Sequence, residues 1–353
     1  MNWGQRIEVF VEYHQIDTRK ARNMDFLLVL MYHIPVDSSR QFIVDTKRSL
    51  GQFFTVSKNP FELKGFQEWA EKANLPKQTI LEPFAGANHI IKSLQDLQLC
   101  NEFISYDIHP AAEDVKECDT LKTFPTGFEV CVTNPPWLAR NSATRRNLPY
   151  PTCEYDNMYK FCLELCLSYC KFVAALIPAS FLQSELFRER LCTYILLHNQ
   201  IFNETDNPVC LALFIDVESE STKVYYDDRF VGNLEDLEAN LPRATKEQYI
   251  RFNDPDGQLG FISFDNTRER SIRFCEAAEI ETYDIKHSSR FITRIGGDFG
   301  RRRNLLKDLN EAVQVFRDET DDLFLTPFKG IRDDGQYRRR MFYSLARDLI
   351  NAV

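Results

Sequence analysis

The sequence has no hydrophobic run long enough to cross a bilayer. The longest apolar stretch near its start begins at Phe26 and is interrupted by His33 and Pro35, whereas a membrane-spanning helix needs about 20 apolar residues. It also has no N-terminal segment with the basic, apolar and small-residue order of a signal peptide. We therefore expect a cytoplasmic protein with no membrane role.

Paired cysteines are absent as well. The ten cysteines are scattered and none forms a CxxC pair, which favours a reducing compartment and free thiols. Cys162, Cys166 and Cys170 recur every four residues, a spacing that resembles a row of ligands, but no CxxC or nearby histidine completes a zinc set. We interpret them as a packed helix face and predict no metal site.

An overall positive charge is absent too. The 353 residues carry a net charge of −9, and proteins that bind nucleic acid indiscriminately usually have a large positive excess. The acid excess lies in residues 61–220, with 13 basic and 22 acidic side chains. Basic patches elsewhere therefore remain compatible with a selective nucleic-acid partner.

Internal repeats and low-complexity linkers are also lacking, so periodicity and turn residues decide the organisation. Residues 1–50 have apolar positions at helical spacing and predict a helical extension. Residues 51–220 alternate strands and helices, which predicts an α/β, doubly wound, Rossmann-like domain with a parallel sheet. Residues 221–353 have short strand-like pieces followed by helices and predict a separate α+β unit.

The individual elements follow from these patterns. In the middle segment we expect strands in TILEPFAGA, EFISYDI, FEVCVT, KFVAALIP and VCLALFIDV, and helices in NHIIKSLQDLQL, EYDNMYKFCLELCLSYC and SFLQSELFRERL. Beyond residue 220 we expect strands in KVYYDDRFVG, GQLGFISFD and SSRFITRIGG, and helices in RNLLKDLNEAVQVF and GQYRRRMFYSLARDLINAV. The GRRRN and YRRRM stretches are interpreted as solvated helix faces that could also follow a DNA backbone.

The first strand ends in a turn that suits a nucleoside cofactor. Gly86 would let the backbone approach a ligand, Asn88 would cap the following helix, and Asp107 ends the next strand at a spacing that suits ribose hydroxyls. The turn lacks GxGxxG and so lacks room for a pyrophosphate. S-adenosylmethionine fits better, because Glu82 can answer its amino or sulfonium charge. The simpler interpretation of Glu82 is a buried cap, and that of Asp107 is a turn former.

Four stretches in sequence order resemble a known family. EPFAGA, SYDIHP, ECDTL and TNPPW resemble motifs I to IV of the S-adenosylmethionine-dependent amino methyltransferases, and GQFFT at 51–55 resembles the motif that precedes them. This order, followed by a C-terminal variable domain, is similar to that of the gamma-class adenine-N6 DNA methyltransferases of restriction-modification systems. The chain departs from the pattern at Asn88, where a second glycine is usual, and at Val56, where a proline often follows.

The resemblance implies a role for each matching residue. In the cofactor pocket it implies contacts from Thr55, Glu82, Phe84, Gly86, Asp107 and Asp119. In the catalytic motif it implies that the side-chain oxygen of Asn134 and the carbonyl of Pro135 accept hydrogen bonds from the target amino group, that Pro136 helps fix the strand end, and that Trp137 stacks on a flipped base. The fold would then be a methyltransferase sheet with a C-terminal DNA-recognition domain over 221–353.

A basic stretch follows the catalytic motif directly. Alone, its composition predicts a solvated, disordered loop, but its position beside Trp137 suits phosphates around a flipped nucleotide. The residues expected to contact DNA are Arg140, Asn141, Ser142, Arg145 and Arg146, with Arg290 and Arg294 as base readers in the C-terminal unit.

The sequence thus predicts an enzyme that methylates N6 of adenine in double-stranded DNA, as a monomer or weak dimer with a cognate restriction endonuclease as a candidate partner. Two other readings stay open. The same acceptors suit RNA or a protein amide, and a degenerate methyltransferase fold would serve as a non-catalytic nucleic-acid-binding module. N4-cytosine methylation is less favoured, because that specificity usually goes with serine before the two prolines.

Overall fold

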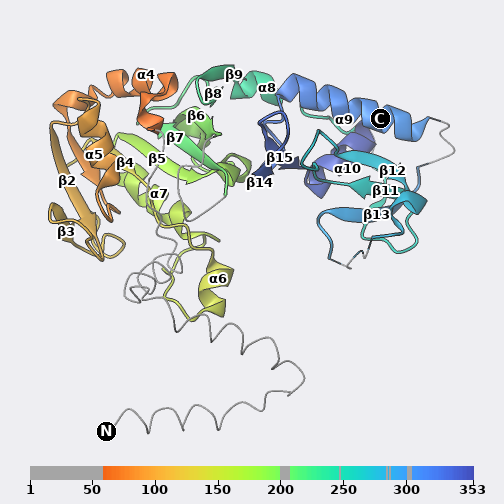
Figure 1. Cartoon of the computed structure of the whole chain (residues 1–353), viewed down its shortest axis with the longest axis horizontal. Coiled ribbons are helices and arrows are strands. Elements are labelled where there is room, and N and C mark those ends of the chain that lie inside the picture. Colours follow the sequence, from red (N-terminus) through yellow and green to blue (C-terminus); the bar gives the residue numbers. More distant parts are fainter. Residues whose placement is uncertain (1–58, 199–206, 246–247, 284, 286–287, 300–303) are drawn as a thin grey trace, which may run out of the picture. The chain divides into compact units, whose positions relative to one another are not determined.

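A nine-stranded mixed sheet forms the larger part of the structure. The computed structural model describes residues 59–198, 207–245, 248–283, 285, 288–299 and 304–353. The strands lie in the order β3-β2-β1-β4-β5-β7-β6-β8-β9 (Figure 1). Their bounds are β1 Thr79–Glu82, β2 Glu102–Asp107, β3 Val115–Glu117, β4 Val130–Thr133, β5 Phe172–Pro178, β6 Leu191–Leu197, β7 Val209–Phe214, β8 Lys223–Tyr226 and β9 Arg229–Asn233.

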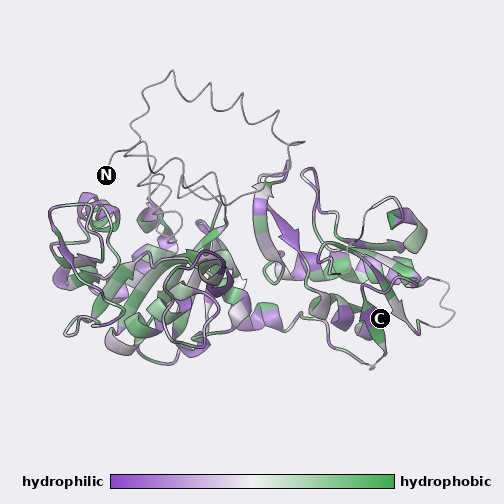
Figure 2. Cartoon of the chain, turned by 90° about the horizontal axis from the view of Figure 1, so that it is seen from below, coloured by the Kyte–Doolittle hydropathy of each residue, from purple (hydrophilic) through white to green (hydrophobic). Residues whose placement is uncertain are grey.

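The first five strands are parallel and β7 is antiparallel to both β5 and β6. Parallel strands are buried on both faces and therefore have nearly continuous apolar sequences. Every residue of β4 and β7 is buried, and the strands of this sheet are largely hydrophobic in colour (Figure 2). The helices here are α4 Lys64–Lys72, α5 His89–Asp96, α6 Arg140–Arg145, α7 Met158–Tyr169 and α8 Leu234–Glu238. The α/β, doubly wound, Rossmann-like fold predicted from the sequence is confirmed.

The cysteine row lies on α7 and packs as predicted. Cys162 and Cys166 are fully buried, and Cys170 directly follows the helix and is 4% exposed. The thiol of Cys166 lies 3.8 Å from that of Cys131 in β4. These side chains therefore help to hold α7 against the strand that leads into the Asn-Pro-Pro-Trp motif.

The remaining strands form two antiparallel sheets with their own hydrophobic core. The four-stranded sheet has the order β10-β13-β11-β12, and β14 pairs with β15. The strands are β10 Ile250–Phe252, β11 Leu259–Ile262, β12 Arg273–Glu276, β13 Ile292–Gly297, β14 Thr326–Ile331 and β15 Tyr337–Arg340, and the helices are α9 Leu305–Thr320 and α10 Tyr343–Ala352. Among the described residues, no helix is long and apolar enough to span a membrane.

A buried ionic cluster joins three pieces of this C-terminal unit. Asp265 follows β11 and is fully buried, and it accepts paired hydrogen bonds of 2.8 Å from Arg317 of α9 and one of 2.8 Å from Arg332. Arg317 also binds both oxygens of Asp322, at 2.7 and 2.8 Å. The paired charges raise the pKa of Arg317 despite its burial. The cluster was not evident from the sequence, because Asp265 lies 52 and 67 residues from Arg317 and Arg332 along the chain.

Two expectations for the elements were wrong. The SFLQSELFRERL stretch forms two short 3-10 segments, Ala179–Ser184 and Arg188–Arg190, because Glu185 and Phe187 between them have positive φ angles of 56°. It then leads into the unpredicted strand β6. The YRRRM stretch is the strand β15 rather than a helix face.

Two confirmed strands, β8 and β9, lie at the predicted start of the C-terminal unit. Strands β8 and β9 were predicted as strands beyond residue 220, but they continue the nine-stranded sheet. The division at 220 and 221 stays a prediction. The helical extension over 1–50 and the GQFFT motif with Thr55 lie outside the described residues, as do the three arginines of GRRRN.

Candidate active site

The EPFAGA, SYDIHP and TNPPW stretches meet at the point of the sheet where the strand order reverses. In the sheet, β1 lies between β2 and β4, and these parallel strands end side by side. Glu82, Asp107 and Thr133 are the last residues of β1, β2 and β4 respectively. Ligands of doubly wound sheets bind outside the carboxyl ends of the strands at such a switch point.

Glu82 is a buried acid with an unusual protonation equilibrium. It is 1% exposed, and its Oε1 accepts hydrogen bonds from the Thr133 hydroxyl at 2.7 Å and the Phe84 backbone N–H at 3.2 Å. Its Oε2 is buried without a hydrogen-bond partner among the described residues. Burial, with a smaller contribution from the charge of Asp107, raises the pKa of Glu82 to about 8. Glu82 is therefore largely protonated at neutral pH. A cationic ligand would favour loss of this proton and could then pair with Oε2.

Asp107 organises the turn after β1. Its Oδ2 accepts a hydrogen bond of 2.8 Å from the Gly86 N–H, and its Oδ1 accepts one of 2.7 Å from the His109 N–H. Gly86 has a φ of 53°, in the left-handed region that glycine adopts without strain. Each carboxylate oxygen keeps a second lone pair, so the anchored acid can still accept hydrogen bonds from hydroxyl groups.

Asn88 stands at the N-terminal end of α5, but its side chain does not cap that helix. The predicted capping bond is absent; instead Asn88 accepts from the Ser105 hydroxyl and donates to Asp114, both at 2.8 Å. Its φ is 60°, a left-handed conformation that asparagine tolerates better than most residues. This explains how asparagine replaces the usual glycine here while tying the turn to β2.

Asp119 and Phe84 lie in the segments next to this turn. The buried Thr120 hydroxyl donates a 3.0 Å hydrogen bond to the carbonyl of Pro83, which holds the segment after β3 against the β1 turn. Asp119 pairs with Lys122 at 2.8 Å, and this bond lowers the pKa of Asp119. Phe84 is half-buried and packs against two hydrophobic clusters, the main core and a smaller one that contains Leu138 and Met158. Their cofactor contacts stay predictions.

The Asn-Pro-Pro-Trp motif follows β4 at once. Asn134 is half-buried, and the adjoining Thr133 makes the hydrogen bond to Glu82 that joins this motif to the β1 turn. Thr133 was not singled out from the sequence, although its place as the last strand residue before the motif was a usable signal. Trp137 is only 8% exposed and packs in the main hydrophobic core, so its ring is not an open stacking face in this conformation.

The basic stretch after the motif is ordered as helix α6, which excludes the disordered loop of the simpler interpretation. Arg140 begins the helix and does not project toward a ligand. Its guanidinium donates to the carbonyls of Cys153 and of Tyr155, the latter at 2.6 Å, and lies 5.3 Å from the Tyr150 ring centre. One terminal nitrogen of the guanidinium thus holds the following loop, and the contact of Arg140 with phosphates stays a prediction.

The other residues of this stretch that we expect to contact DNA are more accessible to solvent. Asn141, Arg145 and Arg146 are exposed, and Ser142 is partly exposed. Among the described residues, Arg145 makes only long hydrogen bonds of 3.4 Å, to the carbonyl of Asn141 and the hydroxyl of Ser142. Their contact with DNA stays a prediction.

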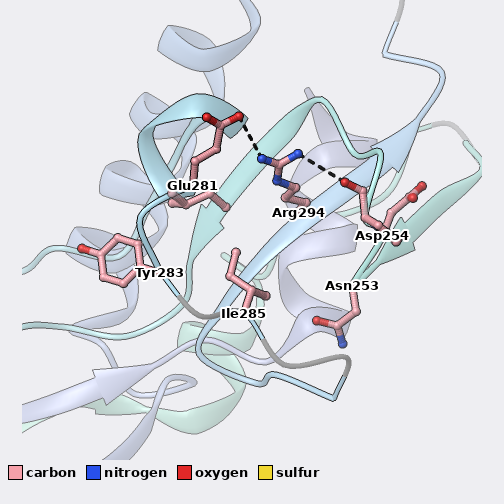
Figure 3. A pocket seen from close by; sticks show the side chains of 8 residues that line it. Asn253, Asp254, Glu281, Tyr283, Ile285 and Arg294 are labelled. Carbon is pink, nitrogen blue, oxygen red and sulfur yellow. Dashed lines mark hydrogen bonds and ion pairs between the residues drawn. The ribbon is translucent and has the colours of Figure 1, made fainter.

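Arg294 lines a cavity of about 290 Å³ in the C-terminal unit, and its positive charge is paired with a carboxylate. Its guanidinium pairs with Glu281 at 3.1 Å and donates to the carbonyl of Pro255 at 3.2 Å (Figure 3). Asn253, Tyr283 and other residues complete the lining. Both terminal nitrogens of the guanidinium are therefore engaged within the unit, and the role of Arg294 as a base reader stays a prediction.

Comparisons with known proteins give structural similarity alone. No protein-family model and no curated protein sequence matches the chain. Similar solved structures include a type I restriction-modification methyltransferase subunit from Streptococcus thermophilus, with 14% identity, a TM-score of 0.35 and 52% of this chain matched to 50% of that chain. A candidate class I S-adenosylmethionine-dependent methyltransferase from Listeria monocytogenes has 13% identity, a TM-score of 0.33 and coverages of 53% and 72%. The DrdV–DNA complex has 14% identity, a TM-score of 0.40 and coverages of 55% and 29%.

The chain spans about half the length of the first restriction-modification subunits that it resembles. A likeness of this degree concerns the fold and not the reaction.

Proposed function

We propose that the chain is an S-adenosylmethionine-dependent methyltransferase that methylates N6 of adenine in double-stranded DNA, as the modification enzyme of a restriction-modification system. The observation that carries the proposal is the 2.7 Å hydrogen bond from Thr133 to Glu82. It fastens the start of the Asn-Pro-Pro-Trp motif to the turn that suits the cofactor. An amine acceptor and a methyl donor would therefore meet at one switch point.

The residues at the turn fit S-adenosylmethionine. Glu82 has a buried oxygen with no hydrogen-bond partner among the described residues, which suits a positively charged group, and Asp107 keeps free lone pairs for ribose hydroxyls. Gly86 has no side chain that would block the approach of a ligand at its position in the turn. Phe84 and Asp119 would complete the pocket from neighbouring segments. When bound, the cofactor supplies an electrophilic methyl group.

The motif's own residues would activate the target amine. The amino nitrogen of adenine is a poor nucleophile because its lone pair is conjugated into the ring. The side-chain oxygen of Asn134 and the carbonyl of Pro135 would accept hydrogen bonds from its two N–H groups and turn the lone pair toward the methyl group. Pro135 and Pro136 restrict φ and keep these acceptors in place. The reaction needs no strong base in the site.

Trp137 would have to become more exposed for the proposed stacking on a flipped base. Its 8% exposure means that a base cannot lie on the ring before the surrounding side chains move. The exposed Arg145, which ends α6, and Arg146, which follows it, would hold the phosphates of the extruded nucleotide. Residues 221–353 would form the domain that recognises the DNA sequence.

One assay separates the proposed substrate from its rivals. The purified chain is incubated with methyl-labelled S-adenosylmethionine and, in parallel, with unmethylated double-stranded DNA, with RNA and with a glutamine-containing peptide, and the products are analysed by mass spectrometry. We expect label in N6-methyladenine from DNA alone. Label in RNA or the peptide would change the substrate class, and no label from a chain that binds DNA would favour the non-catalytic binding module.

A further inference from the structure

Three arginines and four phenylalanines form a continuous surface around strand β15. The strand reads Tyr337-Arg338-Arg339-Arg340, and successive side chains of a strand point to opposite faces. Arg339 is 2% exposed, and its N–H donates to the buried carboxylate of Asp265. Since Arg339 is turned into the protein, Arg338 and Arg340 lie together on the opposite face.

Aromatic contacts connect the members of this face. The Arg338 guanidinium lies 4.7 Å from the ring centre of Phe328 and 5.7 Å from that of Phe264, and Phe264 makes an edge contact of 5.6 Å with Phe291. Arg340 lies 5.8 Å from the Phe291 ring and 4.9 Å from the Phe342 ring. Stacking on a ring holds a guanidinium plane while leaving its N–H edges able to bind an anion.

No carboxylate among the described residues forms an ion pair with the arginines of this face. Within the part of the chain that the structure describes, no ion pair involves Arg290, Arg338 or Arg340, and Arg338 donates only to the backbone carbonyl of Asp265. Partial burial and the neighbouring charge of Arg290 lower the pKa of Arg340. Two like charges held together without a counter-ion oppose folding, so an external anion is the natural complement.

Several other arginines of the same unit are paired with carboxylates. Arg294 pairs with Glu281 and Arg273 pairs with Glu279 at 3.0 Å. Phe291 and Phe342 remain 46% and 39% exposed, although both are large apolar side chains. The surface is therefore charged and aromatic at once, which is the composition that nucleic-acid contacts favour.

We propose that Arg290, Phe291, Arg338, Arg340 and Phe342, here called the arginine–aromatic surface, bind the phosphate backbone of double-stranded DNA. This inference rests on the proposed function and assigns the DNA contact of its C-terminal unit to residues other than Arg294. Arg290 and Arg340 meet adjacent phosphates, and Arg338 extends the contact along one strand.

The salt dependence of DNA binding tests this assignment. Affinity of the full chain for a double-stranded oligonucleotide is measured at several salt concentrations for the wild type and for Arg290→Gln with Arg340→Gln. Each lost phosphate contact should lower the slope of log affinity against log salt by about 0.9, so the double variant should lose up to about two units. Arg273→Gln removes an exposed but paired arginine and should leave the slope unchanged, and Arg340→Lys should largely retain it.

The outcomes separate this assignment from the proposed reaction. A double variant with the wild-type slope overturns the arginine–aromatic surface, even if the wild type methylates DNA. A wild type that does not bind DNA overturns both proposals. A reduced slope in a chain that transfers no methyl group supports the surface and rejects the reaction. Thermal unfolding of each variant shows whether it folds, and Arg290→Gln alone still gives a slope if Arg340→Gln does not fold.

Discussion

At the scale of single residues, Glu82 has the clearest physical signature in the site. A carboxyl group whose pKa rises to about 8 in a buried position is protonated at neutral pH until a cation approaches. This raised pKa also bears on stability. Because the folded state holds the proton more tightly than the unfolded state, the contribution of Glu82 to stability is present at low pH and is lost as the pH rises from about 4.5 to about 8.

The first prediction concerns cofactor binding at neutral pH. Binding of S-adenosylmethionine should release up to one proton near pH 7, since Glu82 must ionise to pair with the ligand's positive charge. Affinity should rise with pH up to about 8. Calorimetry in buffers of different ionisation enthalpy measures the release directly. Glu82→Gln should abolish the release and weaken binding; equal proton release from this variant would remove Glu82 from the cofactor's cationic group.

Residue patterns located the strand ends at the candidate site but not the contacts that support them. Glu82 and Asp107 end strands, Gly86 and Asn134 lie shortly after strand ends, and strand ends can be located from apolar runs and prolines. The partners of these residues could not be located in this way. The hydrogen bond from Thr133 to Glu82 spans 51 residues of sequence, and only the pairing of β1 with β4 brings the two together.

At the scale of elements, sequence periodicity predicted helices and strands correctly where the local conformational preference of the residues agrees with tertiary packing. The strands β1, β2, β4, β5 and β7 and the helices α5, α7 and α9 were all predicted. It failed where packing overrides preference. The apolar spacing before β6 suggests a helix, but left-handed residues break it, and the arginines of β15 suggest a solvated helix, but Arg339 is buried beside Asp265.

The buried ionic cluster gives a prediction at this scale, because it fastens α9 to the end of β11 and to the loop before β15. Asp265→Ala would leave Arg317 and Arg332 buried beside too little negative charge. Removing one partner of a buried pair typically costs about 3–5 kcal/mol. Denaturant unfolding should show a loss of that order.

Asp334→Ala is the matched control for this cluster. Asp334 pairs with the same Arg332 at 2.8 Å, but its side chain is 48% exposed. Exposed pairs contribute about 1 kcal/mol or less. If the two substitutions destabilised the chain equally, the cluster would not be what holds these elements together.

At the scale of the whole molecule, the distribution of charge matters more than its sum. The chain carries a net charge of −9, yet the arginine–aromatic surface and the exposed end of α6 are locally positive. An acidic protein with restricted basic surfaces should bind DNA weakly at random positions and more tightly where both surfaces engage. Composition alone could not place those surfaces, because seven of the fourteen described arginines beyond residue 220 are paired with acids and the sequence does not show which.

The measurement that tests the central claim most directly compares the wild type with Asn134→Ala on the same unmethylated DNA. Labelled methyl transfer to N6 of adenine and S-adenosylmethionine affinity are measured in parallel samples. Loss of an acceptor that acts on the developing charge should lower the transfer rate on the order of 10²-fold or more, while cofactor affinity changes little.

We expect N6-methyladenine from the wild type and nearly none from Asn134→Ala, with both proteins binding the cofactor. Equal methylation by the two proteins, or a wild type that binds S-adenosylmethionine and DNA without transferring the methyl group, would contradict the account.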